Sequence, residues 1–376
     1  MNNYEKIKYK RWLTEQKRKS KPHHAYKNKT FKNKTGQLSE ILLMPVTLDI
    51  YDNQSMEETF RIIQRLEKHQ HSQTNVIILN FKETKEVKAA ALLMLFSVVD
   101  KLIVECNKKI KIINNQVNER VNNTLNRSGM IYLCRKGSLY CSFTDKYLPI
   151  ISSTGGKYRD EIIDFIAKKI YKDMPPALEN IYADAIQEAI NNVAAHAYLN
   201  FDTKVQKKWW LWCEVINDQL YLVLYDAGIG IPNSFEINAD LSRLDTKDEK
   251  TLNELRTIHN QLRIEIPLSF DEHIKALEEC KKNNVQLQQI LLPDPYKIFM
   301  AMHGDMTRKK GRDELKHGQG SKSIKALVSN NEQGILWIFS GFGKMKFVSE
   351  QNVADLTNLP SQLKGTLIQW NIQVTS

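Results

Sequence analysis

The first part of the chain beyond residue 40 alternates between short apolar runs and stretches with apolar side chains at helical spacing. The spacing predicts a helix over 55–69, a buried strand over 75–80 and a strongly apolar helix over 87–105. A strand over 109–114 and a helix over 118–128 follow. Strands that alternate with helices in this order predict βαβ units and a largely parallel sheet.

A serine- and glycine-rich stretch at 152–156 predicts a linker, and the order of elements changes after it. Helical spacing predicts a helix over 158–171 and a long helix over 177–199, with Pro175 and Pro176 between them. The remaining pattern predicts several strands and one helix, with a tight hairpin turn between the first two strands. The strands are expected at 208–216, 220–225, 334–340, 344–348 and 365–374, the turn at Asn217-Asp218 and the helix at 321–328.

Residues 233–316 form a polar, charged insertion that is longer than a connecting loop requires. Helices are predicted within it near 247–263, 271–284 and 296–303. We expect this insertion to carry a specific contact to a partner protein.

Charge divides the chain into two unequal parts. Residues 1–40 hold twelve lysines and arginines against three glutamates, so most of the formal net charge of +11 lies there. Such a segment buries too little apolar surface to offset its conformational entropy, which predicts a basic, partly disordered arm over 1–40. A solubilising arm and an arm that binds a partner are both compatible with this composition, and any attraction to nucleic acid or to an acidic partner is expected to reside in residues 1–35.

The rest of the composition is that of an ordinary globular protein, with 42% hydrophobic and 26% charged residues. No apolar stretch is long enough to predict a membrane span, and the polar, basic start predicts no secretory signal. The cysteines show no paired spacing, which favours free thiols in a reducing, cytoplasmic setting. They are Cys106, Cys134, Cys141, Cys213 and Cys280.

A stripe of polar side chains runs along the predicted long helix. Glu188, Asn192 and His196 are spaced four apart and project from one face, while apolar residues occupy the other faces. A carboxylate, an amide and an imidazole in a row could form a reactive site. An ordinary solvated helix face has the same pattern, and His196 is equally compatible with a structural role.

Three further segments carry glycine next to predicted strands or helices, and each is weak evidence by itself. Asp226 ends a predicted buried strand and leads into a turn containing Gly228 and Gly230. A second glycine loop runs directly into a predicted helix N-terminus, where free amides favour phosphate. The last segment opens the final strand with a Gly-Thr pair. The second glycine loop comprises Gly318, Gln319, Gly320, Ser321 and Lys322, and the Gly-Thr pair is Gly365 with Thr366.

Together and in this order, the four segments resemble the N box, the two glycine boxes and the closing Gly-Thr of the GHKL superfamily. This superfamily contains histidine kinases, chaperone ATPases, type II topoisomerase ATPase subunits and a mismatch-repair ATPase. The motif Glu-Ala-Ile-Asn-Asn-x3-His-Ala-Tyr, which begins at Glu188, is most similar to that of the anti-sigma-factor serine kinases. The second glycine box departs from the family's Gly-x-Gly-Leu-Gly by reading Gly-Gln-Gly-Ser-Lys.

The resemblance implies ATP and Mg²⁺ as cofactors and assigns roles to the matching residues. It implies that Asn192 coordinates Mg²⁺, that Glu188 orients or deprotonates the nucleophile, and that Asp226 accepts a hydrogen bond from the adenine amino group. The nucleotide would contact the turn at Gly228, Gly230 and Ile231, the phosphate loop Gly318–Lys322, and Thr366. Arg308, Lys309 and Lys322 are further candidate phosphate contacts.

The region 41–150 resembles the anti-sigma-factor antagonist (STAS) domain, with a strand ending at Asn80-Phe81, a helix from Lys88 and a helix ending in Arg127-Ser-Gly129. Signalling members carry a phosphorylatable serine at the start of the first of these helices. Here the stretch from Lys88 to Ala91 has no hydroxyl group, and Thr84 in the preceding loop is the nearest one. The resemblance therefore implies a docking or dimerisation module.

The expected fold class is α/β: a C-terminal two-layer α/β sandwich of the GHKL (Bergerat) type at 155–376, with an N-terminal STAS-like βαβ domain at 41–150. The expected function is Mg²⁺-dependent ATP binding and hydrolysis used as a conformational switch within a larger assembly. Two alternatives remain open. One is a serine protein kinase acting on a STAS-type partner, and the other is a non-catalytic ATP-binding module that contacts nucleic acid through the arm. A protein partner and a homodimer are compatible with each of them, and no membrane partner is expected.

Overall fold

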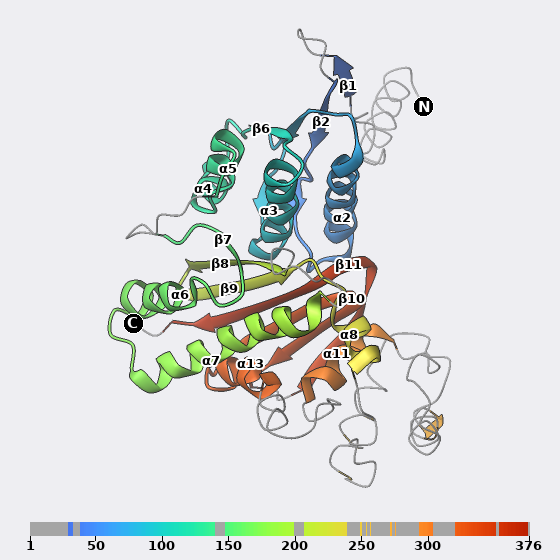
Figure 1. Cartoon of the computed structure of the whole chain (residues 1–376). Helices are drawn as coiled ribbons and strands as arrows, with labels where there is room; N and C mark the ends of the chain where they lie inside the picture. Colours follow the sequence, from blue (N-terminus) through green and yellow to red (C-terminus); the bar gives the residue numbers. More distant parts are fainter. Residues whose placement is uncertain are drawn as a thin grey trace, which may run out of the picture.

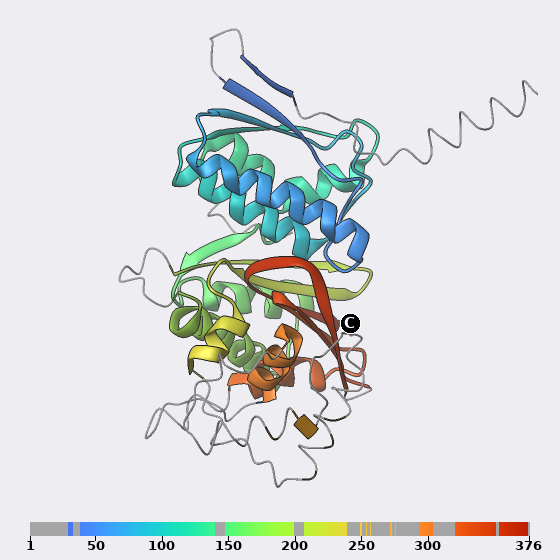
Figure 2. The same ribbon diagram turned by 90° about the vertical axis from the view of Figure 1, so that its right-hand side faces the viewer.

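The structure, a computed structural model, describes residues 29–32, 38–139, 147–198, 207–238, 293–303, 320–350 and 353–374, and the isolated positions 249, 253, 256, 271, 272 and 275. Within these residues the chain is a mixed α/β protein with a mainly parallel sheet and a separate antiparallel sheet. Helices lie between the two sheets, and further helices cover the opposite face of the antiparallel sheet (Figures 1 and 2).

The first sheet has the strand order β1-β2-β4-β6. Strands β2, β4 and β6 are parallel, which confirms the predicted βαβ pattern, and β1 joins β2 antiparallel at the edge. This sheet begins earlier than the predicted boundary at residue 41, because an edge strand held by backbone hydrogen bonds tolerates a lysine-rich sequence. The strands are β1 (Lys29–Lys32), β2 (Leu38–Leu43), β4 (Val76–Asn80) and β6 (Lys109–Ile113), and β3 (Thr47–Leu48) pairs separately with β5 (Glu86–Val87).

The helices of this half are α2 (Asn53–Lys68), α3 (Ala89–Val104), α4 (Glu119–Arg127) and α5 (Met130–Lys136). Their starts are set locally: Asp52 accepts a hydrogen bond from the backbone of Ser55, and Asn118 caps α4 through Val121. Helix α3 is buried along almost its whole length, on every face. A helix that is apolar all round needs cover on both sides. In the described part of the chain no helix combines the length and the apolar character that crossing a membrane requires.

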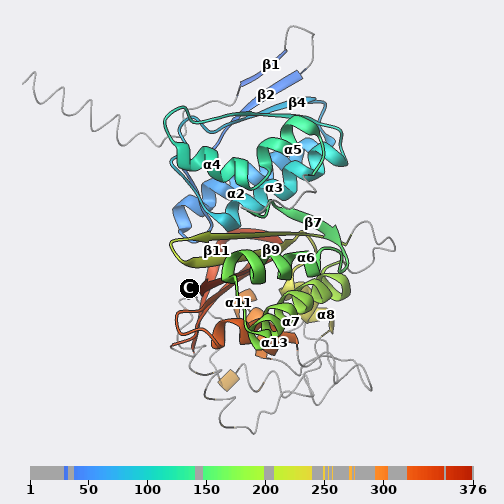
Figure 3. The ribbon, with the colours of Figure 1, turned by 90° about the vertical axis from the view of Figure 1, so that its left-hand side faces the viewer.

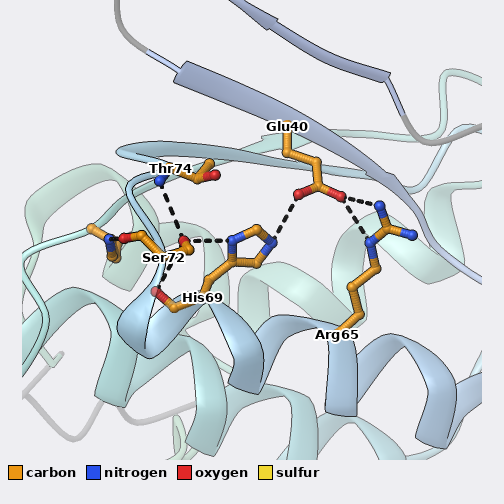
Figure 4. A network of polar contacts seen from close by, with 6 residues as sticks. Glu40, Arg65, His69, Ser72 and Thr74 are labelled. Atoms are coloured by element: carbon orange, nitrogen blue, oxygen red, sulfur yellow. Dashed lines mark hydrogen bonds and ion pairs between the residues drawn. The ribbon is translucent and has the colours of Figure 1, made fainter.

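A buried polar network ties β2 to the end of α2 (Figure 4). The Glu40 carboxylate pairs with His69 Nε2 at 3.0 Å and accepts a hydrogen bond from Arg65 Nε at 2.8 Å. His69 Nδ1 lies 3.0 Å from Ser72 Oγ on its other side. Burial lowers the pKa of His69, and the nearby Glu40 carboxylate partly opposes this shift. Glu40 thus joins β2 to the end of α2 through Arg65 and His69, while His69 Nδ1 contacts the loop after the helix through Ser72.

The second sheet has the order β10-β11-β9-β8-β7 and is antiparallel throughout. Its hairpin between β8 and β9 turns at Asn217 and Asp218, which both have positive φ as the predicted tight turn requires. Two sequence predictions were wrong here. The expected linker at 152–156 contributes edge strand β7, and the two short strands expected at 334–340 and 344–348 form one long strand. The strands are β7 (Ile151–Thr154), β8 (Lys208–Ile216), β9 (Gln219–Asp226), β10 (Ile335–Val348) and β11 (Val353–Gln373).

Helices α6, α7 and α13 cover one face of this sheet (Figures 1 and 3). The predicted helices at 158–171, 177–199, 296–303 and 321–328 are confirmed, but the first two end in π-helical turns. Helix α8 follows β9 directly and was not predicted. The bounds are α6 (Arg159–Phe165) with π turn Ile166–Tyr171, α7 (Pro176–Asn192) with π turn Val193–Ala197, α8 (Ile231–Asn238), α11 (Asp294–His303) and α13 (Gly320–Ser329). The helices predicted near 247–263 and 271–284 lie mostly outside the described residues.

The antiparallel sheet is buried on both faces. Along β8, Trp209 belongs to the core under α6, α7 and α13, whereas the next residue, Trp210, belongs to the core shared with α2 and α3. The same alternation holds for Leu224 and Tyr225 on β9. Since successive strand residues point to opposite faces, one apolar strand contributes to two cores. The two halves of the chain are thereby joined through a continuous apolar interface.

A buried charge reinforces this interface. Asp100 of α3 is fully buried, and its Oδ2 accepts a hydrogen bond from Trp210 Nε1 at 2.8 Å and pairs with Lys208 Nζ at 2.5 Å. On the other side of the interface, the Tyr51 hydroxyl donates a hydrogen bond to the Gln369 side chain of β11. Both contacts join an element of the first half to the second sheet.

Replacing the buried Asp100 should destabilise both halves of the described structure. We expect Asp100→Ala to lower the free energy of unfolding by about 3 kcal/mol, because it leaves Lys208 and the Trp210 indole without their partner. Urea unfolding followed by tryptophan fluorescence and by circular dichroism measures this loss. The matched control is Asp164→Ala, which removes a solvent-exposed pair with Lys168 and should change stability by less than about 0.5 kcal/mol. Equal effects of the two variants would contradict the interface described above.

Candidate functional site

A row of four residues crosses the antiparallel sheet near the end of β9. Ser340 lies opposite Thr366, Thr366 lies opposite Asp226, and Asp226 lies opposite Trp209. Directly opposed residues of neighbouring strands point to the same face of a sheet. Trp209 belongs to the core beneath α7, so the row faces the helices α6, α7 and α13. Two of the sequence-predicted site residues, Asp226 and Thr366, are thereby brought together although they lie far apart in the sequence.

Asp226 is the charged member of this row. Its side chain is almost fully buried, and Oδ1 accepts a hydrogen bond from the backbone of Gly228 at 2.8 Å. Burial raises the pKa of Asp226 to about 7, although the amides of Gly228 and Thr366 and the charge of Lys101 oppose the shift. A carboxylate in such a position gains from any ligand that donates a hydrogen bond to it.

The turn after Asp226 packs directly against the end of α7. The Ile229 amide donates a hydrogen bond to Ala197 O at 2.7 Å, and a side chain on Gly228 would come within 2.1 Å of the same oxygen. Gly230 has a φ of +83°, and a Cβ there would meet Ser340 Oγ at 2.7 Å. Both glycines of the predicted first glycine box are therefore required by contacts between segments of the protein itself.

The Gly365-Thr366 pair at the bend of β11 is packed equally closely. Gly365 has a φ of +81°, and a Cβ there would lie 2.0 Å from Asp226 O. Any side chain at this position would push β11 away from the end of β9. The sequence pattern marked this glycine correctly, and its physical reason is the close approach of two backbones.

The polar stripe on α7 is present, but its last member occupies a different type of turn. Glu188 and Asn192 lie in the α-helical part and are half-buried, whereas His196 lies in the π turn Val193–Ala197. A π turn changes the angular spacing of side chains, so the four-residue spacing does not carry the stripe on to His196. Glu188 and Asn192 therefore share one regular helix face, and His196 lies beyond it.

Glu188 has a raised pKa, caused chiefly by its partial burial and opposed by a hydrogen bond with the Asn191 side chain. Asn191 in turn accepts a hydrogen bond from Gln187 Nε2 at 2.8 Å through its own Oδ1. A half-buried carboxyl with a raised pKa and a fixed neighbour has the properties of a general base. Sequence analysis singled out Asn192 and missed Asn191.

Tyr198 is a second residue that sequence analysis missed. Its hydroxyl donates to Lys208 O at 2.7 Å and accepts from the amide of Ala227, the residue after Asp226, at 3.2 Å. The side chain thus joins the end of α7, strand β8 and the turn after β9. The Ala-Tyr pair after His196 was visible in the motif, but only the fold shows what the hydroxyl contacts.

The second glycine box is described only from Gly320 onwards, where α13 begins. Ser321 at this start is half-buried and Lys322 is exposed. The helix is held to the sheet by Trp370, whose Nε1 donates to Ile324 O at 2.9 Å. Gly318, Gln319, Arg308 and Lys309 lie outside the described residues. Within the described part of the chain, no cluster of three or more His, Cys, Asp or Glu side chains is arranged to hold a metal ion.

The raised pKa of Asp226 predicts a specific pH dependence of stability. The folded state binds this proton more tightly than the unfolded chain, so stability should fall as pH rises from about 4 to about 7. The expected decrease is on the order of 3 kcal/mol and should be absent from an Asp226→Asn variant. Urea unfolding of both proteins at pH 4.5 and pH 8 measures it. Parallel pH profiles for the two proteins would show that Asp226 is not the buried acid described here.

Comparison with protein-family models gives no match for this chain, and comparison with curated protein sequences gives no relative.

Proposed function

We propose that this chain binds ATP with Mg²⁺ in its C-terminal unit and hydrolyses it, using the cycle as a conformational switch within a larger assembly. The observation that carries the proposal is the buried Asp226, which lies beside Thr366 at the end of β9, directly before a turn packed on the end of α7. We propose further that the C-terminal unit is a GHKL-type sandwich and that the N-terminal unit is STAS-like. The antiparallel sheet with helices α6, α7 and α13 on one face supports the first assignment, and parallel β2, β4 and β6 support the second.

Asp226 would accept a hydrogen bond from the 6-amino group of adenine. Its burial supports this role, because a buried carboxylate contributes most when it receives a donor in a dry site. Thr366 would contact the same edge of the base, and Gly228, Gly230 and Ile231 would form the wall of the pocket. A purine without the amino group would leave the carboxylate without that donor.

The phosphate groups would lie at the start of α13. The amides from Gly318 to Ser321 would hold them, together with the positive end of the helix dipole and the Lys322 ammonium group. Asn192 would hold Mg²⁺ through its amide oxygen, an oxygen ligand of the kind this ion takes. The ion supplies charge neutralisation on the phosphate oxygens when bound.

Glu188 would act on the attacking water. The raised pKa of its half-buried carboxyl favours proton uptake, and the Asn191 side chain orients it. The same chemistry would serve a protein hydroxyl in place of water, which is the serine kinase alternative. The similarity of the motif from Glu188 to that of the serine kinases favours the kinase alternative, and the N-terminal unit could then recruit a STAS-type substrate.

The described N-terminal unit itself offers no hydroxyl at the start of α3 to accept a phosphate. Thr84 is fully buried, and its hydroxyl donates a hydrogen bond to Pro45 O at 2.9 Å. A kinase of this type would therefore act on a separate protein. The remaining alternative, a non-catalytic ATP-binding module that contacts nucleic acid through residues 1–35, predicts salt-sensitive binding without phosphate release.

Two substitutions on α7 separate binding from chemistry. We expect Glu188→Gln to retain ATP binding and to lower phosphate release at least 100-fold, because it removes the base and keeps the shape. Asn192→Ala should abolish the Mg²⁺-dependent part of the binding. The measurements are release of labelled phosphate from γ-labelled ATP and titration calorimetry with and without Mg²⁺.

The matched control is Asp184→Asn, an exposed carboxylate one turn earlier on the same helix, which should leave both measurements unchanged. Phosphate release that persists in Glu188→Gln would remove Glu188 from the chemistry. ATP binding without release in the unchanged protein would direct the search to a protein acceptor. Absence of ATP binding in the unchanged protein would refute the proposed function as a whole.

A further inference from the structure

The Ser340 hydroxyl lies where three segments of the candidate site meet. It is fully buried at the point where β10 loses its regular pairing with β11. Its Oγ lies 2.7 Å from Gly365 O, 2.8 Å from Ile231 N and 3.3 Å from Thr366 Oγ1. One side chain therefore contacts the start of α8 at Ile231, the backbone of Gly365 and the side chain of Thr366, which lies beside Asp226.

The directions of these hydrogen bonds follow from the groups involved. Gly365 O is a carbonyl and only accepts, so the single proton of Ser340 is donated to it. The Ile231 amide only donates, so it occupies one lone pair of Ser340 Oγ. Thr366 can then interact with Ser340 only as the donor. Its proton is directed towards Ser340, and its lone pairs remain for whatever lies beside Asp226.

We propose that Ser340 is a positioning residue that sets base selectivity, by fixing Thr366 as an acceptor next to the carboxylate of Asp226. This inference rests on the proposed function. The ionised Asp226 also only accepts, so the row presents acceptors alone to the base edge. Where position 6 of the purine meets this row, a 6-amino group supplies the protons that the two acceptors lack, whereas a 6-oxo group adds a third acceptor with no donor between them.

Removal of the Ser340 hydroxyl would free the Thr366 proton. The Thr366 hydroxyl could then rotate and donate to a 6-oxo group, so discrimination between the two purines would weaken. A purely structural role for Ser340 would change the affinities for both purines by the same factor. The ratio of two affinities therefore separates the two roles, which a single affinity does not.

The test compares ATP with ITP, which carry an amino and an oxo group respectively at the same ring position. Titration calorimetry with Mg²⁺ at pH 8.5 keeps Asp226 ionised, since its pKa is about 7. The unchanged protein should prefer ATP, and Ser340→Ala should reduce the ATP-to-ITP affinity ratio about tenfold. The control is Ser349→Ala, whose hydroxyl contacts the carbonyls of Asn331 and Glu332 just beyond the other end of β10. It should leave the ratio unchanged.

Each outcome is decisive. An unchanged ratio in Ser340→Ala, with ATP still bound by the unchanged protein, overturns the role of Ser340 and leaves the proposed function standing. Failure of the unchanged protein to bind either nucleotide overturns both. If Ser340→Ala does not fold, Ser340→Cys supplies the second variant, because a thiol places a larger atom at the same position and forms only weak hydrogen bonds. The ratio should fall in that variant too, and an unchanged ratio overturns the inference.

Discussion

Burial of the antiparallel sheet on both faces is the constraint on which the rest of the structure depends. A sheet covered on one side alternates apolar and polar residues, but β8 reads Trp209, Trp210, Leu211, Trp212 and Cys213 without interruption, and all five are buried. Such strands need a second layer, which α2 and α3 provide. The apolar character of α3 has the same origin, because this helix packs against the parallel sheet on one side and against the antiparallel sheet on the other. Two units that look separate in the sequence therefore share one core.

This arrangement places the candidate site on a firmly held element. Tyr225, the residue before Asp226, points to the opposite face and is buried against the N-terminal unit, and its hydroxyl donates to Lys364 O at 2.8 Å. Tyr225 thus anchors the end of β9 on the face towards α2 and α3, while Asp226 points to the face towards α7. A carboxylate can keep a raised pKa only if its surroundings do not relax to admit water. The docking of the first half on the opposite face of the sheet contributes to this condition.

Sequence patterns predicted the regular elements well where local physics decides them. Helical spacing predicted a helix over 55–69, close to the observed α2, and the β8–β9 hairpin follows from Asn217 and Asp218. The same patterns failed where the deciding contact lies elsewhere in the chain. Residues 152–156 read as a linker because serine and glycine are common in loops, yet Ile151–Thr154 gains its strand from pairing with β8. The π turn at Val193–Ala197 has no signal in residue type, so the place of His196 on the stripe was not predictable.

In the candidate site, too, the sequence marks positions but does not show which contacts they make, and the glycines illustrate this. Gly228 and Gly230 were singled out because glycine lets a backbone approach a ligand, and Gly365 as part of the closing Gly-Thr pair, and each of the three is in close contact with another segment of the protein. These close approaches bring Asp226, Thr366 and the end of α7 together. Side chains such as Tyr198 and Ser340 hold the assembled segments by hydrogen bonds to backbone groups distant in sequence. Nothing in the local sequence distinguishes them from ordinary core hydroxyls, so their roles emerge only once the three segments have been placed side by side.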